Sequence, residues 1–147
     1  MTSGGVQVLG LGRTERGDDG VGVEVVRRLR ELGVCAEALS DPSALVERLD
    51  GTPTILVDAV LARPEGALVE LGVDELAKVA AVSSHAMSVP AAVGLAEVLH
   101  GPTPVRILGI TIRPPGPAES GLSPAVCAAA DAAVLQIQAW LESPSNA

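Results

Sequence analysis

The hydrophobic positions of this chain fall into short continuous runs, and longer segments with helical spacing lie between some of them. Short apolar runs bounded by turn residues are typical of strands that are buried on both faces of a sheet. We predict strands at Val6–Leu11, Thr54–Val60, Ala67–Gly72 and Val105–Ile112, and a weaker strand at Cys35–Leu39.

Apolar residues between these runs recur at the spacing of amphipathic helices. We predict helices at 21–33, from 84 or 88 to 100, and at 123–142. Gly33 ends the first helix, and Ser123 followed by Pro124 is typical of an N-cap and first helical residue.

Strands that alternate with helices predict an α/β fold, in which a mainly parallel sheet carries helices on both faces. The short link between Val60 and Ala67 contains Pro64 and Gly66 and has the character of a hairpin, which predicts one antiparallel strand. Because 147 residues is an ordinary length for one domain, we expect residues 1–147 to form a single domain.

Composition narrows the classes of partner. Eighteen acidic and ten basic side chains give a net charge of −8, and there is one Trp with no Phe or Tyr. Such a chain lacks a phosphate-binding surface and a base-stacking platform, so we expect no nucleic-acid partner. Every apolar stretch of about 18 residues contains charged or turn residues, and the N-terminus has no basic segment followed by an apolar run. We therefore expect a cytoplasmic protein that is not inserted in a membrane. Cys35 and Cys127 are interpreted as reduced core thiols.

The stretch GLGRTERGDDGVG, residues 10–22, follows the first predicted strand and has five glycines and two adjacent carboxylates. Glycine-rich turns before a helix usually hold phosphate. The dinucleotide pattern requires glycine where this chain has Glu15, and a P-loop requires Lys and Ser or Thr where it has Asp18 and Asp19. Because carboxylates repel phosphate, the turn is better suited to a cation.

The glycines of this stretch have a mechanical interpretation. We expect Gly10 and Gly12 to allow a tight turn out of the first strand. Gly20 and Gly22 are expected to let the following helix approach the sheet, where a Cβ atom would intrude. A side chain at Gly12 is therefore expected to displace the turn.

Candidate metal ligands lie near the ends of the predicted strands. Asp18 and Asp19 follow the first strand, Asp58 ends the strand in ILVDAV, and His85 lies in SSHAMS before the second helix. Ligands of open parallel sheets bind beyond the carboxyl ends of the strands, so we expect these side chains to converge. Two carboxylates and one imidazole would form a three-ligand site for Zn, Ni or a similar transition metal.

Each of these residues also has a structural explanation. Asp18 suits the N-cap of a helix, and a loop N–H or an arginine could satisfy Asp58. A lone His85 is more often structural than catalytic, and His100 is interpreted as a structural residue in the last turn of a helix.

The segments VLGLGRTERGDDGVG, LVDAV, SSHAMSV and ILGITIRPPGPAESGLSPAV resemble, in this order, the four conserved segments of the hydrogenase maturation proteases. The resemblance extends from Val8 to about Ala139. These endopeptidases remove a C-terminal extension from the large subunit of [NiFe]-hydrogenase after nickel has been installed. The resemblance implies a twisted, five-stranded, three-layer α/β sandwich.

The resemblance also implies the site and the partner. Asp19, Asp58 and His85 match the family's metal ligands and, with Asp18, form the expected catalytic site. The expected metal is the nickel of the substrate, for which zinc or cadmium would substitute in vitro. The site either recognises this nickel or activates a water, with Asp18 as base or orienting group. The expected partner is the large-subunit precursor, bound by a monomeric protease.

Three features depart from the family's pattern. Arg13 stands where the family has Asn, and Glu15 or Arg16 where it has an aliphatic residue. The family's D-G-G-T-x-G segment is missing, and LSDPSALVERL takes its place, with Asp41 matching only in a shifted register. These departures leave the three metal ligands unchanged and bear on which substrate the protein takes. Two alternatives stay open: a non-proteolytic nickel-binding maturation chaperone with the same fold, and a small-molecule or nucleotide binder that uses the glycine-rich turn.

Overall fold

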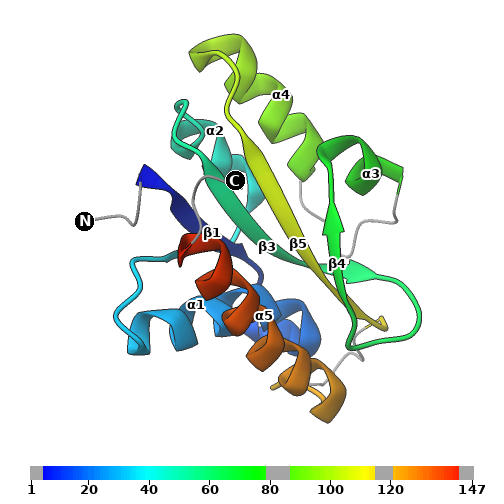
Figure 1. The fold of residues 1–147 in the computed structure, drawn as a ribbon. Coiled ribbons are helices and arrows are strands. Elements are labelled where there is room, and N and C mark those ends of the chain that lie inside the picture. The colour runs from blue at the N-terminus through cyan, green and yellow to red at the C-terminus, as the bar shows by residue number, and fades with distance from the viewer. Residues whose placement is uncertain (1–4, 79–86, 115–120, 143–147) are drawn as a thin grey trace.

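The computed structural model describes residues 5–78, 87–114 and 121–142, and Figure 1 shows a central sheet with helices on both faces. The five strands of the described residues are β1 (Gln7–Leu11), β2 (Glu37–Leu39), β3 (Thr54–Leu61), β4 (Leu68–Leu71) and β5 (Val105–Ile112). They lie in the order β2-β1-β3-β5-β4. The predicted strands and the α/β sandwich are confirmed.

The position of the antiparallel strand differs from the hairpin prediction. β1, β2, β3 and β5 are parallel to one another, and β4 is antiparallel. However, β4 pairs with β5, which lies between β3 and β4, so the link between Val60 and Ala67 is not a hairpin. The reason is burial: the last six residues of β5 are buried and occupy a central place, whereas β4 is only partly buried and takes the edge.

The helices cover the two faces of the sheet in separate groups. They are α1 (Val21–Glu31), α2 (Leu45–Arg48), α3 (Val73–Lys78), α4 (Val89–His100) and α5 (Pro124–Glu142), with 3₁₀ segments η2 (Thr14–Gly20) and η3 (Pro42–Ala44). In Figure 1, α1 and α5 lie on one side of the sheet, and α2 and α4 lie on the other.

The predicted helices begin and end close to their expected residues. α4 starts after Ser88, whose Oγ accepts a hydrogen bond from the Ala91 N–H at 3.2 Å, so Ser88 is its N-cap. The alternative start at Ser84 lies outside the described residues. α2 and α3 were not predicted because helices of four and six residues are too short to show a helical period.

Two hydrophobic cores explain why the strands are continuous apolar runs. Val8, Val57 and Ile110 pack with α1 and α5, whereas Leu9 and Leu56 pack with α2 and α4. Successive strand residues point to opposite faces. A strand covered on both faces therefore has no polar alternation, as the sequence pattern predicts.

Helix α5 is long and apolar enough, by length and composition alone, to cross a membrane. Its buried residues face the core that α1 shares, and they are Val126, Ala129, Ala130, Ala133, Val134 and Ile137. This packing identifies it as a core helix of the sandwich.

The cysteines are both free thiols, but only one is even partly buried. Cys35 is exposed, so its assignment to the core is wrong; it lies in the connection that leads from α1 to β2. Cys127 on α5 is partly buried, and its Sγ accepts a hydrogen bond from Arg28 Nη2 at 3.2 Å.

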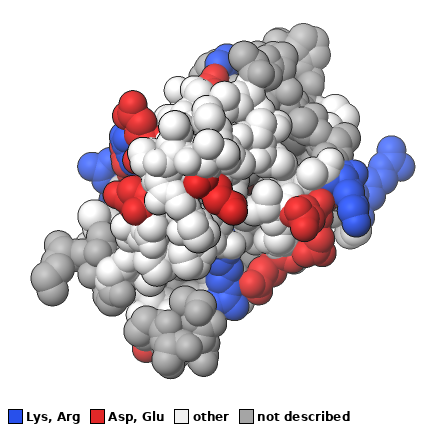
Figure 2. All heavy atoms as spheres, turned by 90° about the horizontal axis from the view of Figure 1, so that it is seen from above, with Lys and Arg blue, Asp and Glu red and all other residues white. Residues whose placement is uncertain are grey.

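Charged side chains are scattered over the face drawn in Figure 2, which looks onto the upper side of Figure 1. Outside the grey residues, the basic atoms form no continuous patch on this face. α4 contributes exposed Leu95, Val98 and Leu99 to the molecular surface.

Candidate functional site

The glycine-rich turn carries two carboxylates to the carboxyl end of the sheet. β1 ends at Leu11, and η2 then leads through Asp18 and Asp19 into α1. Gly12 has a φ of +152°, and a Cβ atom at this residue would lie 2.2 Å from the backbone oxygen of Asp19. Only glycine fits such a close approach of two backbone segments. The expected role of Gly12 in the turn is therefore confirmed.

The first turn of α1 lies directly against the sheet. A Cβ atom on Gly22 would be 2.2 Å from the Leu11 oxygen and 2.8 Å from the Val57 oxygen. A Cβ atom on Gly10 would in turn be 2.3 Å from the Gly22 oxygen. Helix and strands meet backbone to backbone, as predicted, and this contact positions the start of α1 beside Asp58.

Asp18 links the turn to the start of α5. Asp18 is 4% exposed, and its carboxylate accepts hydrogen bonds from the Ser123 N–H at 2.7 Å and the Ser123 Oγ at 3.0 Å. Ser123 directly precedes α5, as predicted, so the carboxylate lies at the positive end of that helix. The contacts support Asp18 as a positioning group, while its role in catalysis stays a prediction.

Replacing Ser123 by alanine tests this link. The variant leaves one buried oxygen of Asp18 without its hydroxyl donor, and we expect it to lower the free energy of unfolding by about 1–2 kcal/mol, measured by urea denaturation. Ser43→Ala is the matched control because Ser43 is exposed and binds Asp41 through its backbone N–H. Equal effects of the two variants would contradict the proposed link.

Asp58 lies inside β3 and does not end it as predicted, because β3 stays paired with β5 as far as Leu61. β1 is shorter: its last residue paired with β3 is Gly10, opposite Val57. Asp58 therefore lies next to the point where β1 ends and the glycine-rich turn begins. The Ala59 N–H donates to Asp58 Oδ1 at 2.9 Å, which is the kind of backbone partner expected for a partly buried carboxylate.

Asp19 and Asp58 lie near enough for the charge of one to affect the other. Asp19 is 3% exposed, and Asp58 is partly buried. Burial raises the pKa of Asp58 to about 7; the Ala59 N–H opposes this effect, and the negative charge of Asp19 adds to it. A carboxyl group that holds its proton near neutral pH, beside a second buried carboxylate, is suited to receiving a cation or exchanging a proton.

The remaining predicted ligand, His85, lies outside the described residues, so its role stays a prediction. Within residues 5–78, 87–114 and 121–142, no three His, Cys, Asp or Glu side chains lie close enough to hold a metal ion. The structure thus brings together Asp19 and Asp58 of the predicted set, with Asp18 held alongside by Ser123.

Two residues that depart from the family's pattern have structural positions. Asp41 is the N-cap of η3, where its Oδ1 accepts a hydrogen bond from the Ser43 N–H at 2.9 Å. Arg13 is the partly buried N-cap residue of η2, next to Gly12. Local sequence identifies Ser123 only as a helix cap, because its bond to Asp18 spans 105 residues and has no local sequence signal.

This chain matches known proteins by structure and not by sequence. No protein-family model matches the chain, and no curated protein matches it by sequence. Solved structures match over nearly the whole length. The [NiFe] hydrogenase maturation protease HybD from Thermococcus kodakarensis is 23% identical, with 96% of this chain and 99% of that chain covered and a TM-score of 0.77. The hydrogenase maturating endopeptidase HybD from E. coli is 22% identical, with 97% and 94% covered and a TM-score of 0.77.

A third similar structure is the [NiFe] hydrogenase maturation protease HycI from Thermococcus kodakarensis KOD1. It is 21% identical, with 93% of this chain and 92% of that chain covered and a TM-score of 0.74. In all three comparisons the coverage is nearly complete in both directions. This chain has the fold of the hydrogenase maturation proteases.

Proposed function

We propose that this protein is an endopeptidase of hydrogenase maturation, which removes a C-terminal extension from the large-subunit precursor of a [NiFe]-hydrogenase. The observation that carries the proposal is that buried Asp19, which follows the carboxyl end of β1, lies near partly buried Asp58 of the neighbouring strand β3. Open parallel sheets bind their ligands at this end. Similar structures named as hydrogenase maturation proteases share the fold along its length and support the same activity.

In the proposed reaction, Asp19, Asp58 and His85 contact the nickel that the precursor already contains. A cation between Asp19 and Asp58 offsets their mutual repulsion, and two carboxylates with one imidazole are a donor set that transition metals accept. Asp58 has to release its proton before it can bind a cation, since its pKa is raised to about 7. Recognition of nickel would restrict cleavage to precursors whose metal centre is complete.

The proposal leaves two chemical routes for cleavage. The nickel contact either positions the scissile peptide or lowers the pKa of a bound water so that it attacks the peptide carbonyl. In both routes Asp18 acts indirectly, because Ser123 holds both of its carboxylate oxygens. We therefore expect Asp18→Asn to reduce processing less than Asp19→Asn does.

The test is incubation of the protein with nickel-loaded and nickel-free large-subunit precursor, followed by mass spectrometry of the large subunit. We expect loss of the C-terminal extension from the nickel-loaded precursor only. An uncut nickel-loaded precursor would contradict the protease assignment. If the protein nevertheless binds nickel in the same experiment, the result would favour the alternative function, a nickel-binding maturation chaperone.

A further inference from the structure

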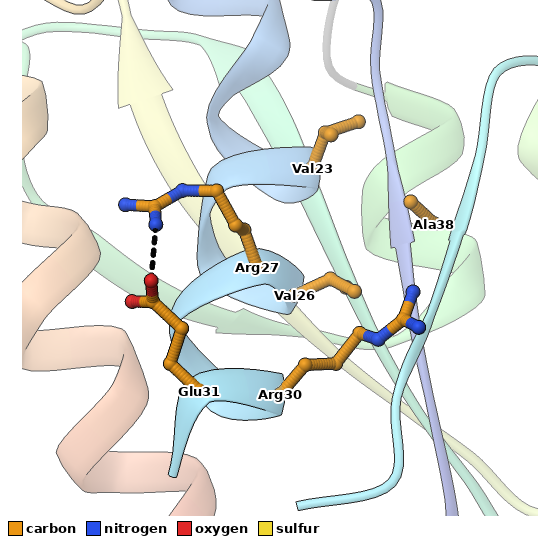
Figure 3. A pocket seen from close by; sticks show the side chains of 6 residues that line it. All are labelled: Val23, Val26, Arg27, Arg30, Glu31 and Ala38. Atoms are coloured by element: carbon orange, nitrogen blue, oxygen red, sulfur yellow. Dashed lines mark hydrogen bonds and ion pairs between the residues drawn. The ribbon is translucent and has the colours of Figure 1, made fainter.

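A groove lies between α1 and the edge strand β2, and Figure 3 shows the side chains that line it. Its volume is about 370 Å³. Its lining combines an apolar part with charged side chains, and the residues are Val23, Val26, Arg27, Arg30, Glu31 and Ala38. We propose that this groove binds an extended peptide segment with an acidic side chain, which pairs with β2 and with Arg30.

The backbone of β2 offers hydrogen-bonding groups to such a peptide. β2 is the end strand of the sheet, and within the described residues no strand pairs with its outer edge. The Leu39 carbonyl accepts a hydrogen bond from the Gly12 N–H on the β1 side at 3.2 Å. Because N–H and C=O of one strand residue point to the same side and alternate along the strand, those of Ala38 point to the outer edge. Added strands bind to such edges.

The side chains of β2 agree with this orientation. Leu39 is buried in the core on the α2 and α4 face, and Glu37 pairs with Arg48 of α2. Ala38 therefore points to the opposite face, where it lines the groove beside α1. A peptide paired with Ala38 would lay alternate side chains against Val23 and Val26.

The charge of the groove identifies the chemistry of the peptide. Arg27 is engaged with Glu24 and Glu31, and Figure 3 shows Arg27 and Glu31 turned toward each other. Arg30 reaches instead toward the Ala38 side of the groove, and its guanidinium makes no hydrogen bond or ion pair within the described part of the chain. Its guanidinium is the cation left to receive a carboxylate, which it binds through two parallel N–H donors.

The groove also sets the spacing of the peptide. Val23 and Arg30 are seven residues apart on α1, a rise of about 10 Å, which about three extended residues cover. An acidic residue two or three positions from an apolar one therefore fits both ends. Because the chain carries a net charge of −8, we expect the attraction to be local to Arg30.

Three heptapeptides serve as probes, each with an acetylated N-terminus and an amidated C-terminus. The first alternates Thr and Val and contains one Glu, and the second has Gln in place of that Glu. The third is the Glu peptide with N-methylated backbone amides. Binding is followed by NMR titration of the full chain. We expect the Glu peptide to shift the amide signals of Val26 and Ala38 and to bind about three- to fivefold more tightly than the Gln peptide. Backbone N-methylation should weaken binding at least about threefold, because it removes donors to the β2 edge.

Arg30→Gln should bring the Glu peptide to the affinity of the Gln peptide. Arg63→Gln is the control, because Arg63 is exposed and lies in the connection that leads to β4. Equal affinity of wild type for the Glu and Gln peptides, or shifts confined to other surfaces, would overturn the proposal. So would a dimer that sedimentation detects and that the peptides displace from Ala38, since it would assign the edge to a second copy. No outcome depends on proteolysis, because binding is measured without cleavage.

Discussion

Asp58→Asn is expected to leave nickel-loaded precursor largely uncut and, at the same time, to stabilise the metal-free protein at pH 8. Under the proposed function the variant removes one of three contacts to nickel. Mutation of a residue that only supports a metal ligand lowers activity roughly 10- to 100-fold, so we expect the loss of a ligand to lower processing by at least that factor. The stability gain has a separate cause. Wild type at pH 8 has to hold an ionised carboxylate in the site beside Asp19, and asparagine does not.

The direction of the pH dependence follows from the raised pKa. The Asp58 carboxyl titrates at about 7 in the folded chain and near its ordinary value of 3.8 in the unfolded chain. Between these values the folded state binds more protons, so the contribution of Asp58 to stability is largest at low pH and is lost as the pH rises through about 7. Three pKa units correspond to roughly 4 kcal/mol, and we expect about 2–4 kcal/mol at pH 8 and little difference at pH 4.

The measurement is urea denaturation of wild type and Asp58→Asn in a chelator from pH 4 to pH 8. The difference between the two proteins cancels the titration of all groups that do not interact with Asp58. Asp74→Asn, an exposed carboxylate in the first turn of α3, is the control and should track wild type within about 0.5 kcal/mol. A constant difference across the pH range would contradict the raised pKa, whereas wild-type processing by the variant would contradict only the nickel contact.

The parts of the fold that the sequence predicts are those with a local physical cause. β1, β3 and β5 are mostly buried and are therefore continuous apolar runs, and all five predicted runs became strands. Glycine is required at residues 10, 12 and 22 because a Cβ atom there would lie 2.2–2.3 Å from a backbone oxygen, and the spacing of these glycines around one turn made that role predictable. The meeting of Asp19 with Asp58 also follows, because Asp19 comes after the carboxyl end of β1 and Asp58 comes directly after the last residue of the parallel strand β3 that pairs with β1.

The parts that escaped prediction depend on distant residues. Insertion of β5 between β3 and β4 is decided by which strand needs full burial, and the short link after β3 gives no sign of it. The bond between Asp18 and Ser123 joins residues 105 positions apart. Cys35 has apolar neighbours in the sequence, yet it is exposed in the connection that precedes β2. Local pattern describes each element, and tertiary contacts decide where the elements meet.

The same substitution, glycine to alanine, is expected to have opposite effects in two helices of this protein. At Gly22 in α1, the new Cβ would meet the backbone oxygens of Leu11 and Val57 at 2.2 and 2.8 Å. Strand backbone cannot move aside as a flexible side chain can, so α1 has to shift away from the sheet. We expect Gly22→Ala to lower the free energy of unfolding by about 3 kcal/mol or more.

Gly94 in α4 provides the matched control, because it is exposed and a Cβ atom there would meet nothing within 4 Å. Alanine has the higher helix propensity, so Gly94→Ala should stabilise the protein by about 0.5–1 kcal/mol. Urea denaturation of both variants gives the comparison. The shift of α1 in Gly22→Ala should also move Asp19 relative to Asp58, so its Asp58 pKa, followed by NMR, should fall toward the ordinary value. Stabilisation by both variants would show that α1 does not rest on the backbone of β1 and β3, and the positioning of Asp19 by that contact would then be wrong.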